Sequence, residues 1–173
     1  MSAANAAAPR LLGIDPGLER CGYAVLDGSA RRVLDAGVIR TTLRRPLPER
    51  LLELETGLEE LFREHAIGQA IVEDLYAHYA HPRTAILMGH ARGVALLVAA
   101  RHDAAVQSLP ATQIKKSLTG NGHATKAQVQ RAVMLTLGLT RAPEPADVAD
   151  AIAIALGGAI FSRRGATPRR PPA

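Results

Sequence analysis

Four acidic residues lie where their carboxylates could bind one ligand together. Asp15 ends an apolar run and is followed by Pro-Gly, and Glu73 ends a second apolar run. Asp147 and Asp150 are three residues apart, so they share one face of a helix. Converging carboxylates repel one another unless cations lie between them, and Mg²⁺ prefers oxygen ligands. The sequence therefore predicts a magnesium site with these four acids as ligands, an arrangement typical of phosphodiester hydrolysis.

Each of these acids also has an ordinary explanation. An aspartate before Pro-Gly is common in turns, which would account for Asp15. An acid in the first turn of a helix offsets the helix dipole, which would account for Asp147. The dipole explains Asp150 less well, because alanines border it on both sides. The functional interpretation gains its weight from the four acids occurring together.

Basic residues gather around a glycine-containing loop between two expected helices. Lys115, Lys116 and Lys126 are candidate contacts to a phosphate backbone, and a solvated helix face would explain them equally well. The formal net charge of +5 favours a polyanionic partner such as nucleic acid and also fits a basic soluble protein. Tyr76 and Arg83 come from a segment with few core-forming residues. We expect the ring of Tyr76 to stack on bases and Arg83 to add a further DNA contact.

The elements that must position these residues follow from apolar patterning and turn residues. Short apolar or alternating runs predict five strands, at residues 11–15, 22–26, 33–39, 70–73 and 105–109. Helical spacing predicts five helices, at residues 47–61, 82–100, 111–118, 126–137 and 146–162. Opening hairpins followed by alternating strands and helices predict an α/β fold, a mixed five-stranded sheet flanked by helices on both faces. Ligands are then expected near the carboxyl ends of the strands.

Composition predicts one domain over residues 10–162, since the chain has 173 residues. Residues 1–9 and the Pro- and Arg-rich residues 163–173 are expected to be disordered tails. Cys21 is the only cysteine, which excludes an intrachain disulfide and a cysteine-based zinc site. No run approaches the roughly 20 apolar residues of a membrane span, so we expect a cytoplasmic protein without a membrane partner.

Five motifs follow one another in order between about residues 11 and 160. They are Gly13-Ile14-Asp15-Pro16-Gly17 with Gly22-Tyr23, then Glu73, then Gly89-His90-Ala91-Arg92-Gly93-Val94, then Lys115 with Lys126, and last Asp147-Val148-Ala149-Asp150-Ala151. Each motif alone is common, and the set resembles the RuvC family of Holliday junction resolvases. The resemblance implies an RNase H-like fold and a homodimer with two active sites on one face. It also implies symmetric nicking of two opposed strands of a four-way DNA junction in recombination and repair, with the RuvA-RuvB branch-migration complex as partner.

The resemblance also assigns roles to individual residues. By position, Asp15, Glu73, Asp147 and Asp150 match the family's acidic tetrad, which holds Mg²⁺, with two ions per site expected and Mn²⁺ as an alternative. Lys115 and Lys126 match the family's phosphate-neutralising lysines, and we count Lys126 with the catalytic group. Tyr76 matches a stacking aromatic that is usually phenylalanine, and the helix around residues 89–100 matches the dimer interface.

This sequence departs from the family pattern in the loop at residues 77–88, which is about one residue longer, so the resemblance does not give the preferred cleavage sequence. His90 replaces a commoner glutamine, and Asp74 adds an acid expected to point away from Glu73. Three other functions are weighed against the resolvase. They are a YqgF-type nuclease acting on RNA, a junction-binding protein without catalysis, and a sugar-kinase-like ATPase that would use the Asp15-Pro-Gly segment as its phosphate loop. The intact tetrad argues against the second and the short chain against the third.

Overall fold

The computed structural model describes residues 9–75 and 82–163 of the chain. Their elements follow the predicted order of three strands, a helix, a strand, a helix, a strand and three helices. The strands are β1 (Arg10–Asp15), β2 (Arg20–Leu26), β3 (Val33–Arg40), β4 (Ile67–Glu73) and β5 (Ala105–Leu109). The helices are α1 (Leu47–His65), α2 (Pro82–Arg101), α3 (Ala111–Thr119), α4 (Lys126–Leu137) and α5 (Ala146–Arg163). Tyr76 and most of both expected tails lie outside the described residues.

The five strands form one mixed sheet in the order β3-β2-β1-β4-β5. β1 pairs antiparallel with β2 and parallel with β4, in a register that places Ile14 opposite Val72. Because β1 and β4 run side by side in the same direction, their carboxyl ends meet at one edge of the sheet. Asp15 and Glu73, the last residues of these strands, therefore lie on neighbouring strands at the same edge.

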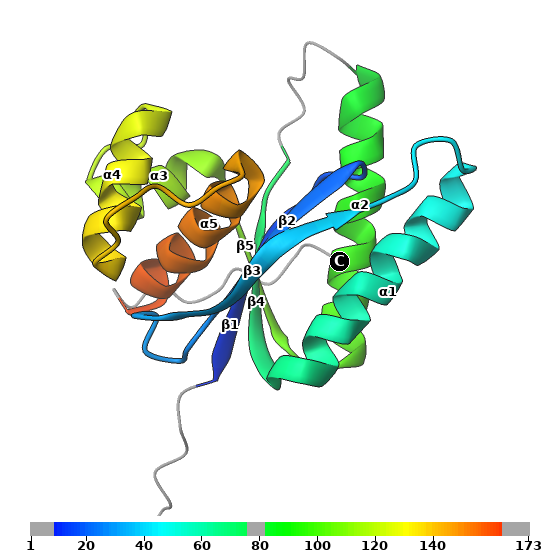
Figure 1. Ribbon diagram of the computed structural model, residues 1–173, viewed down its shortest axis with the longest axis horizontal. Coiled ribbons are helices and arrows are strands. Elements are labelled where there is room, and N and C mark those ends of the chain that lie inside the picture. Colours follow the sequence, from blue (N-terminus) through cyan, green and yellow to red (C-terminus); the bar gives the residue numbers. More distant parts are fainter. Residues whose placement is uncertain (1–8, 76–81, 164–173) are drawn as a thin grey trace, which may run out of the picture.

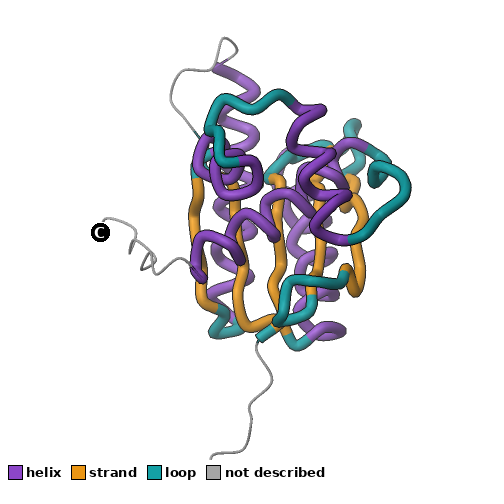
Figure 2. Tube along the Cα trace, turned by 90° about the vertical axis from the view of Figure 1, so that its left-hand side faces the viewer, coloured by secondary structure: helices purple, strands orange, loops and turns teal. Residues whose placement is uncertain are grey.

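Helices cover both faces of the sheet, as predicted. Figure 1 shows α1 and α2 on one face and α3, α4 and α5 on the other, and Figure 2 looks onto the second face, with helices in front of the strands. Each face has its own apolar core: α5 contributes to one, with Leu26 and Ile71, and α1 and α2 contribute to the other, with Leu12 and Val72. No helix in the described ranges is both long and apolar enough to span a membrane.

The strand and helix bounds differ from the prediction mainly at their ends. β2 begins at Arg20, two residues before the expected start, because Arg20 pairs with Arg40 of β3. α1 continues to His65, and β4 begins at Ile67. α5 ends at Arg163, the first residue of the expected C-terminal tail. The predicted α/β class and layer arrangement are confirmed.

Candidate active site

The position of α5 depends on two glycines in the sheet beneath it. A Cβ added at Gly13 would lie 2.3 Å from the backbone oxygen of Ala151, and one added at Gly22 would lie 2.3 Å from that of Asp147. Only glycine lets the helix backbone come so close to β1 and β2. The first turns of α5 are therefore held against the strand that ends in Asp15, which brings Asp147 and Asp150 to the same edge of the sheet.

The two strand-end acids carry the electrostatic signs of this crowding. Burial raises the pKa of Asp15 from 3.8 to about 6, and the negative charges of Asp150 and Asp147 add to the rise. Burial likewise raises the pKa of Glu73 from 4.5 to about 7, with further contributions from Asp15 and Asp150. Carboxylates with such pKa values are sites where a bound cation would relieve repulsion.

Two basic residues from outside α5 hold its two acids. Lys126 Nζ donates to Asp150 Oδ2 at 2.9 Å, and this hydrogen bond raises the pKa of Lys126. Arg20 donates to Asp147 Oδ2 through Nε at 2.8 Å, and its Nη2 lies 2.5 Å from the same oxygen. Lys126 is fixed at the first position of α4 by Thr125, whose side chain and that of Gln128 form a capping box.

A pocket of about 270 Å³ connects the acids to the basic helices. Glu73, Lys115, Lys126 and Asp150 line its polar side, and side chains of α3, α4 and α5 line the rest. The positive charge of Lys115 opposes the rise in the pKa of Glu73. The structure thus brings together six residues singled out in the sequence, namely Asp15, Glu73, Asp147, Asp150, Lys115 and Lys126.

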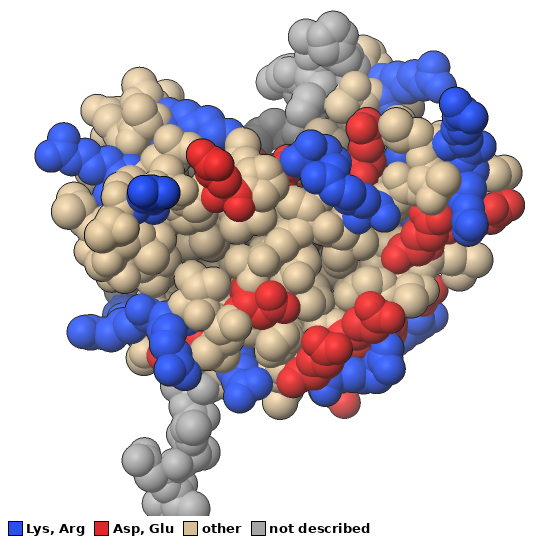
Figure 3. Space-filling view, viewed as in Figure 1, with Lys and Arg blue, Asp and Glu red and all other residues tan. Residues whose placement is uncertain are grey.

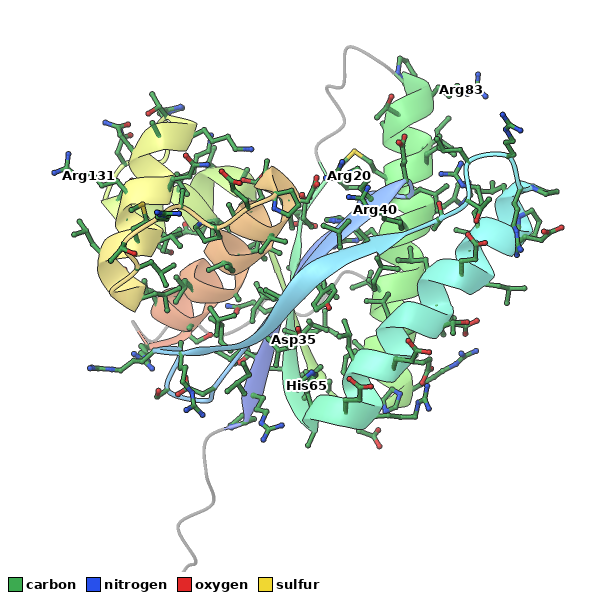
Figure 4. The ribbon with its side chains drawn as sticks, in the orientation of Figure 1. Arg20, Asp35, Arg40, His65, Arg83 and Arg131 are labelled. Carbon is green, nitrogen blue, oxygen red and sulfur yellow. The ribbon has the colours of Figure 1, made fainter. Side chains whose placement is uncertain are left out.

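The remaining predicted contacts lie farther from this group. Lys116 is exposed, whereas its neighbour Ile114 is buried against α5, and Lys116 does not line the pocket. Arg83 is exposed at the start of α2, at the upper edge of the molecule in Figure 4. As expected, Asp74 points away from Glu73, because it accepts a hydrogen bond of 2.7 Å from Arg92 of α2, on the opposite face of the sheet.

Arg20 is a site residue that the sequence analysis missed. Figure 4 shows it beside Arg40 at the end of the sheet that carries the acids, whereas Asp35 and His65 lie toward the other end. The signal was present in the alternation of β2: residues of even number, such as Ala24 and Leu26, face the α5 side, and Cys21 faces the other core. An arginine two residues before Gly22 must therefore point toward α5.

The donor set fits a hard divalent cation, since it consists of carboxylate oxygens and lacks thiolate and imidazole. Within the described residues, however, no three acids, histidines or cysteines surround one point as a ready-made cage. The carboxylates of α5 are engaged by Arg20 and Lys126 instead. Each of these contacts takes only Oδ2 of its carboxylate, and the backbone already brings all four acids to the same edge of the sheet.

Comparison with known proteins identifies the family. A sequence model of the family described as crossover junction endodeoxyribonuclease RuvC matches residues 11–158. A crossover junction endodeoxyribonuclease RuvC of Rhodopirellula baltica is 51% identical over 150 residues, which cover 86% of this chain and 84% of the relative. A Nocardioides relative with the same description is 43% identical over 150 residues, covering 85% of this chain and 84% of its own.

Solved structures agree in fold over the same length. The structure described as Thermus thermophilus RuvC in complex with Holliday junction substrate superimposes with a TM-score of 0.85 at 32% identity, covering 91% of this chain and 96% of that one. A yeast mitochondrial Holliday junction resolvase shares the fold alone, with a TM-score of 0.65 at 13% identity. The family match over most of the chain, and the acids and lysines gathered at one edge of the sheet, lead to one conclusion: this chain belongs to the RuvC family of crossover junction endodeoxyribonucleases.

Proposed function

We propose that this protein resolves four-way DNA junctions by hydrolysing one phosphodiester bond in each of two opposed strands. The observation that carries the proposal is the convergence of Asp15, Glu73, Asp147 and Asp150 at one edge of the sheet, on a fold shared with a RuvC solved with a Holliday junction. The described helices that flank the acids also present lysines toward them, as a phosphate-binding site requires.

The four acids would hold Mg²⁺, with two ions per site and Mn²⁺ as an alternative. The raised pKa values of Asp15 and Glu73 support this assignment, because burial, and after it the charges of the neighbouring acids, disfavours their ionised forms, which a bound cation would stabilise. When bound, the cations would lower the pKa of a water molecule and stabilise negative charge on the departing oxygen.

The lysines would hold the scissile strand. Lys126 has an exposed side chain beside Asp150, and Lys115 lines the pocket next to Glu73, so both ammonium groups can reach a phosphate placed over the acids. Lys126 acts in the catalytic group by neutralising the phosphate as negative charge develops on it. Lys116 and Arg83, which are exposed farther out, would contact flanking DNA, and Tyr76 would stack at the opened junction.

A second copy of the chain would cover the outer face of α2. This face exposes a stripe at helical spacing, formed by Ile86, Gly89, Gly93 and Leu97, in which the two large side chains are 61% and 49% exposed. A Cβ added at either glycine would meet nothing within 4 Å, so the stripe has room for another helix. A homodimer would supply two sites for two strands, and the family resemblance adds the RuvA-RuvB complex as partner.

Substitution of Asp15 by asparagine tests the proposed chemistry. Asp15→Asn removes one oxygen ligand and lessens the repulsion of DNA phosphates, so we expect junction binding to be kept. Loss of even an outer partner of a metal ligand costs about 10- to 100-fold in activity, so cleavage in Mg²⁺ should fall by more than about 100-fold. Gel retardation and cleavage of the same labelled junction measure both effects, and cleavage near the unsubstituted rate would contradict the role of Asp15.

A further inference from the structure

Arg20 approaches the active site from a direction that neither lysine uses. It lies at the start of β2, in register with Arg40 of β3, and its side chain crosses toward the first turn of α5. Lys115 and Lys126 come from α3 and α4, on the other side of the acids. In Figure 3, basic side chains accordingly appear on both sides of the indentation at the upper edge of the molecule.

The contact between Arg20 and Asp147 is a fork on a single oxygen. Both Nε, at 2.8 Å, and Nη2, at 2.5 Å, point to Oδ2 of Asp147. Among the described residues, no hydrogen bond reaches the other oxygen, Oδ1. Two donors on one oxygen fix the rotation of the carboxyl group and leave its second oxygen available.

The strand beneath adds a second restraint on the same residue. Gly22, two residues after Arg20 on the same face of β2, lies directly under the backbone of Asp147. The main chain of Asp147 is thus placed by close packing, and its side chain is placed by Arg20. Both restraints come from β2, the strand paired with the one that carries Asp15.

We propose that Arg20 is a positioning residue, which holds Asp147 by one carboxylate oxygen so that the other is directed to the divalent cation. The inference rests on the proposed function, because it assumes that Asp147 is a cation ligand. Partners that orient metal ligands in this way contribute about 10- to 100-fold to metal affinity or activity. Arg20 would act through Asp147 and would not itself contact the cation.

The sign of the change in cation affinity on removal of Arg20 distinguishes a positioning role from an effect of its charge alone. A positive charge near a cation site repels the cation, so removing Arg20 would strengthen cation binding if its charge were the main effect. If Arg20 orients Asp147, its removal must weaken cation binding. Arg40 supplies the matched control, because it is an exposed arginine on the adjacent strand, directly opposite Arg20 in register.

The experiment is a calorimetric titration of the full chain with Mn²⁺ in the absence of DNA. We expect Arg20→Gln to weaken Mn²⁺ binding by about tenfold. Arg20→Lys, which keeps the charge and one donor, should recover part of this loss, and Arg40→Gln should leave the affinity unchanged or slightly stronger. In an Asp147→Asn background, Arg20→Gln should have no further effect, since there is no carboxylate left to orient.

Unchanged or stronger Mn²⁺ binding by Arg20→Gln would overturn the inference. Weaker binding of a four-way junction in EDTA, with unchanged Mn²⁺ affinity, would make Arg20 a phosphate contact and would overturn it as well. Thermal unfolding shows whether Arg20→Gln is folded. If it is not, the Mn²⁺ affinity of Arg20→Lys is compared with that of the unsubstituted chain instead. Absence of Mn²⁺ binding by the unsubstituted chain would instead refute the cation site itself, and the inference with it.

Discussion

At the scale of residues, the four acids fall into two pairs with different surroundings. Asp147 and Asp150 each accept hydrogen bonds from a basic side chain. Asp15 and Glu73, at the ends of buried strands, are crowded by burial and by neighbouring carboxylates, and their pKa values rise to about 6 and about 7. Without a cation, the second pair therefore takes up protons near neutral pH, and cation binding should release them.

The raised pKa of Glu73 predicts how stability depends on pH. In the unfolded chain Glu73 loses its proton near pH 4.5, and in the folded chain it keeps the proton up to about pH 7, so the unfolded state binds fewer protons between these values. The contribution of Glu73 to stability is therefore fully present below about pH 4.5 and is lost as the pH rises to about 7. Glu73→Gln removes this loss.

We expect Glu73→Gln, in EDTA at pH 8, to raise the free energy of unfolding by about 1–2 kcal/mol, after allowance for partial exposure. At pH 4.5 the variant and the unsubstituted chain should differ little. Urea unfolding at both pH values measures the difference, with Glu60→Gln, an exposed acid of α1, as control. A variant that is less stable at pH 8 would show that Glu73 is not strained in the folded chain.

At the scale of elements, the sequence carries most of the information about the sheet and helices. Turn residues and apolar alternation place all five strands, and helical spacing places all five helices, because these patterns depend on neighbours along the chain. The meeting of Asp15 with Glu73 also follows, since strand-end residues of adjacent parallel strands share one edge.

What the sequence alone does not give are contacts between distant elements. Arg20 and Asp147 are 127 residues apart, and their pairing depends on the position along β2 at which α5 crosses the strand. That position is set by the close packing of α5 on Gly13 and Gly22, which cannot be deduced until both elements are placed in space. The exposed position of Lys116 beside the pocket-lining Lys115 likewise depends on the face of α3 that packs against α5.

Substitution of Gly22 tests the close packing of α5 against β2. Gly22→Ala adds a Cβ within 2.3 Å of the backbone oxygen of Asp147, so the first turn of α5 must shift away from β2. Overpacking of this kind costs about 1–3 kcal/mol. We expect a lower midpoint in urea unfolding and, in the folded variant, weaker Mn²⁺ binding because Asp147 moves. An unchanged midpoint and Mn²⁺ affinity would contradict the packing role of Gly22.

At the scale of the whole molecule, the acids lie at one edge of the sheet and the exposed stripe of α2 lies on an outer face. A dimer through this stripe would bring two active sites into a single particle, which is what paired nicks in two opposed strands require. The two faces of the sheet thus differ in function: α3, α4 and α5 lie on the face next to the four acids, and α2, on the other face, would set the distance between the two active sites.

Leu97→Glu tests the dimer. Leu97 is 49% exposed in the stripe, so a glutamate there should be tolerated in the monomer but should place two unpaired charges in a dimer interface. We expect sedimentation to show a folded monomer. In a cleavage assay, the nicks in the two opposed strands should no longer be paired. Leu52→Glu, at a leucine that is 60% exposed on α1, should remain dimeric. A persistent Leu97→Glu dimer would place the interface elsewhere.

If the four acids bind the cations that cleave DNA, the protein must cut four-way junctions in a metal-dependent way. The most direct measurement compares, in Mg²⁺ and in EDTA, cleavage of a synthetic mobile junction and of a linear duplex with the same sequences, with each strand labelled in turn. We expect paired nicks in opposed strands of the junction, in Mg²⁺ only, and an intact duplex. Cleavage in EDTA, equal cleavage of the duplex, or junction binding without any cut would contradict it.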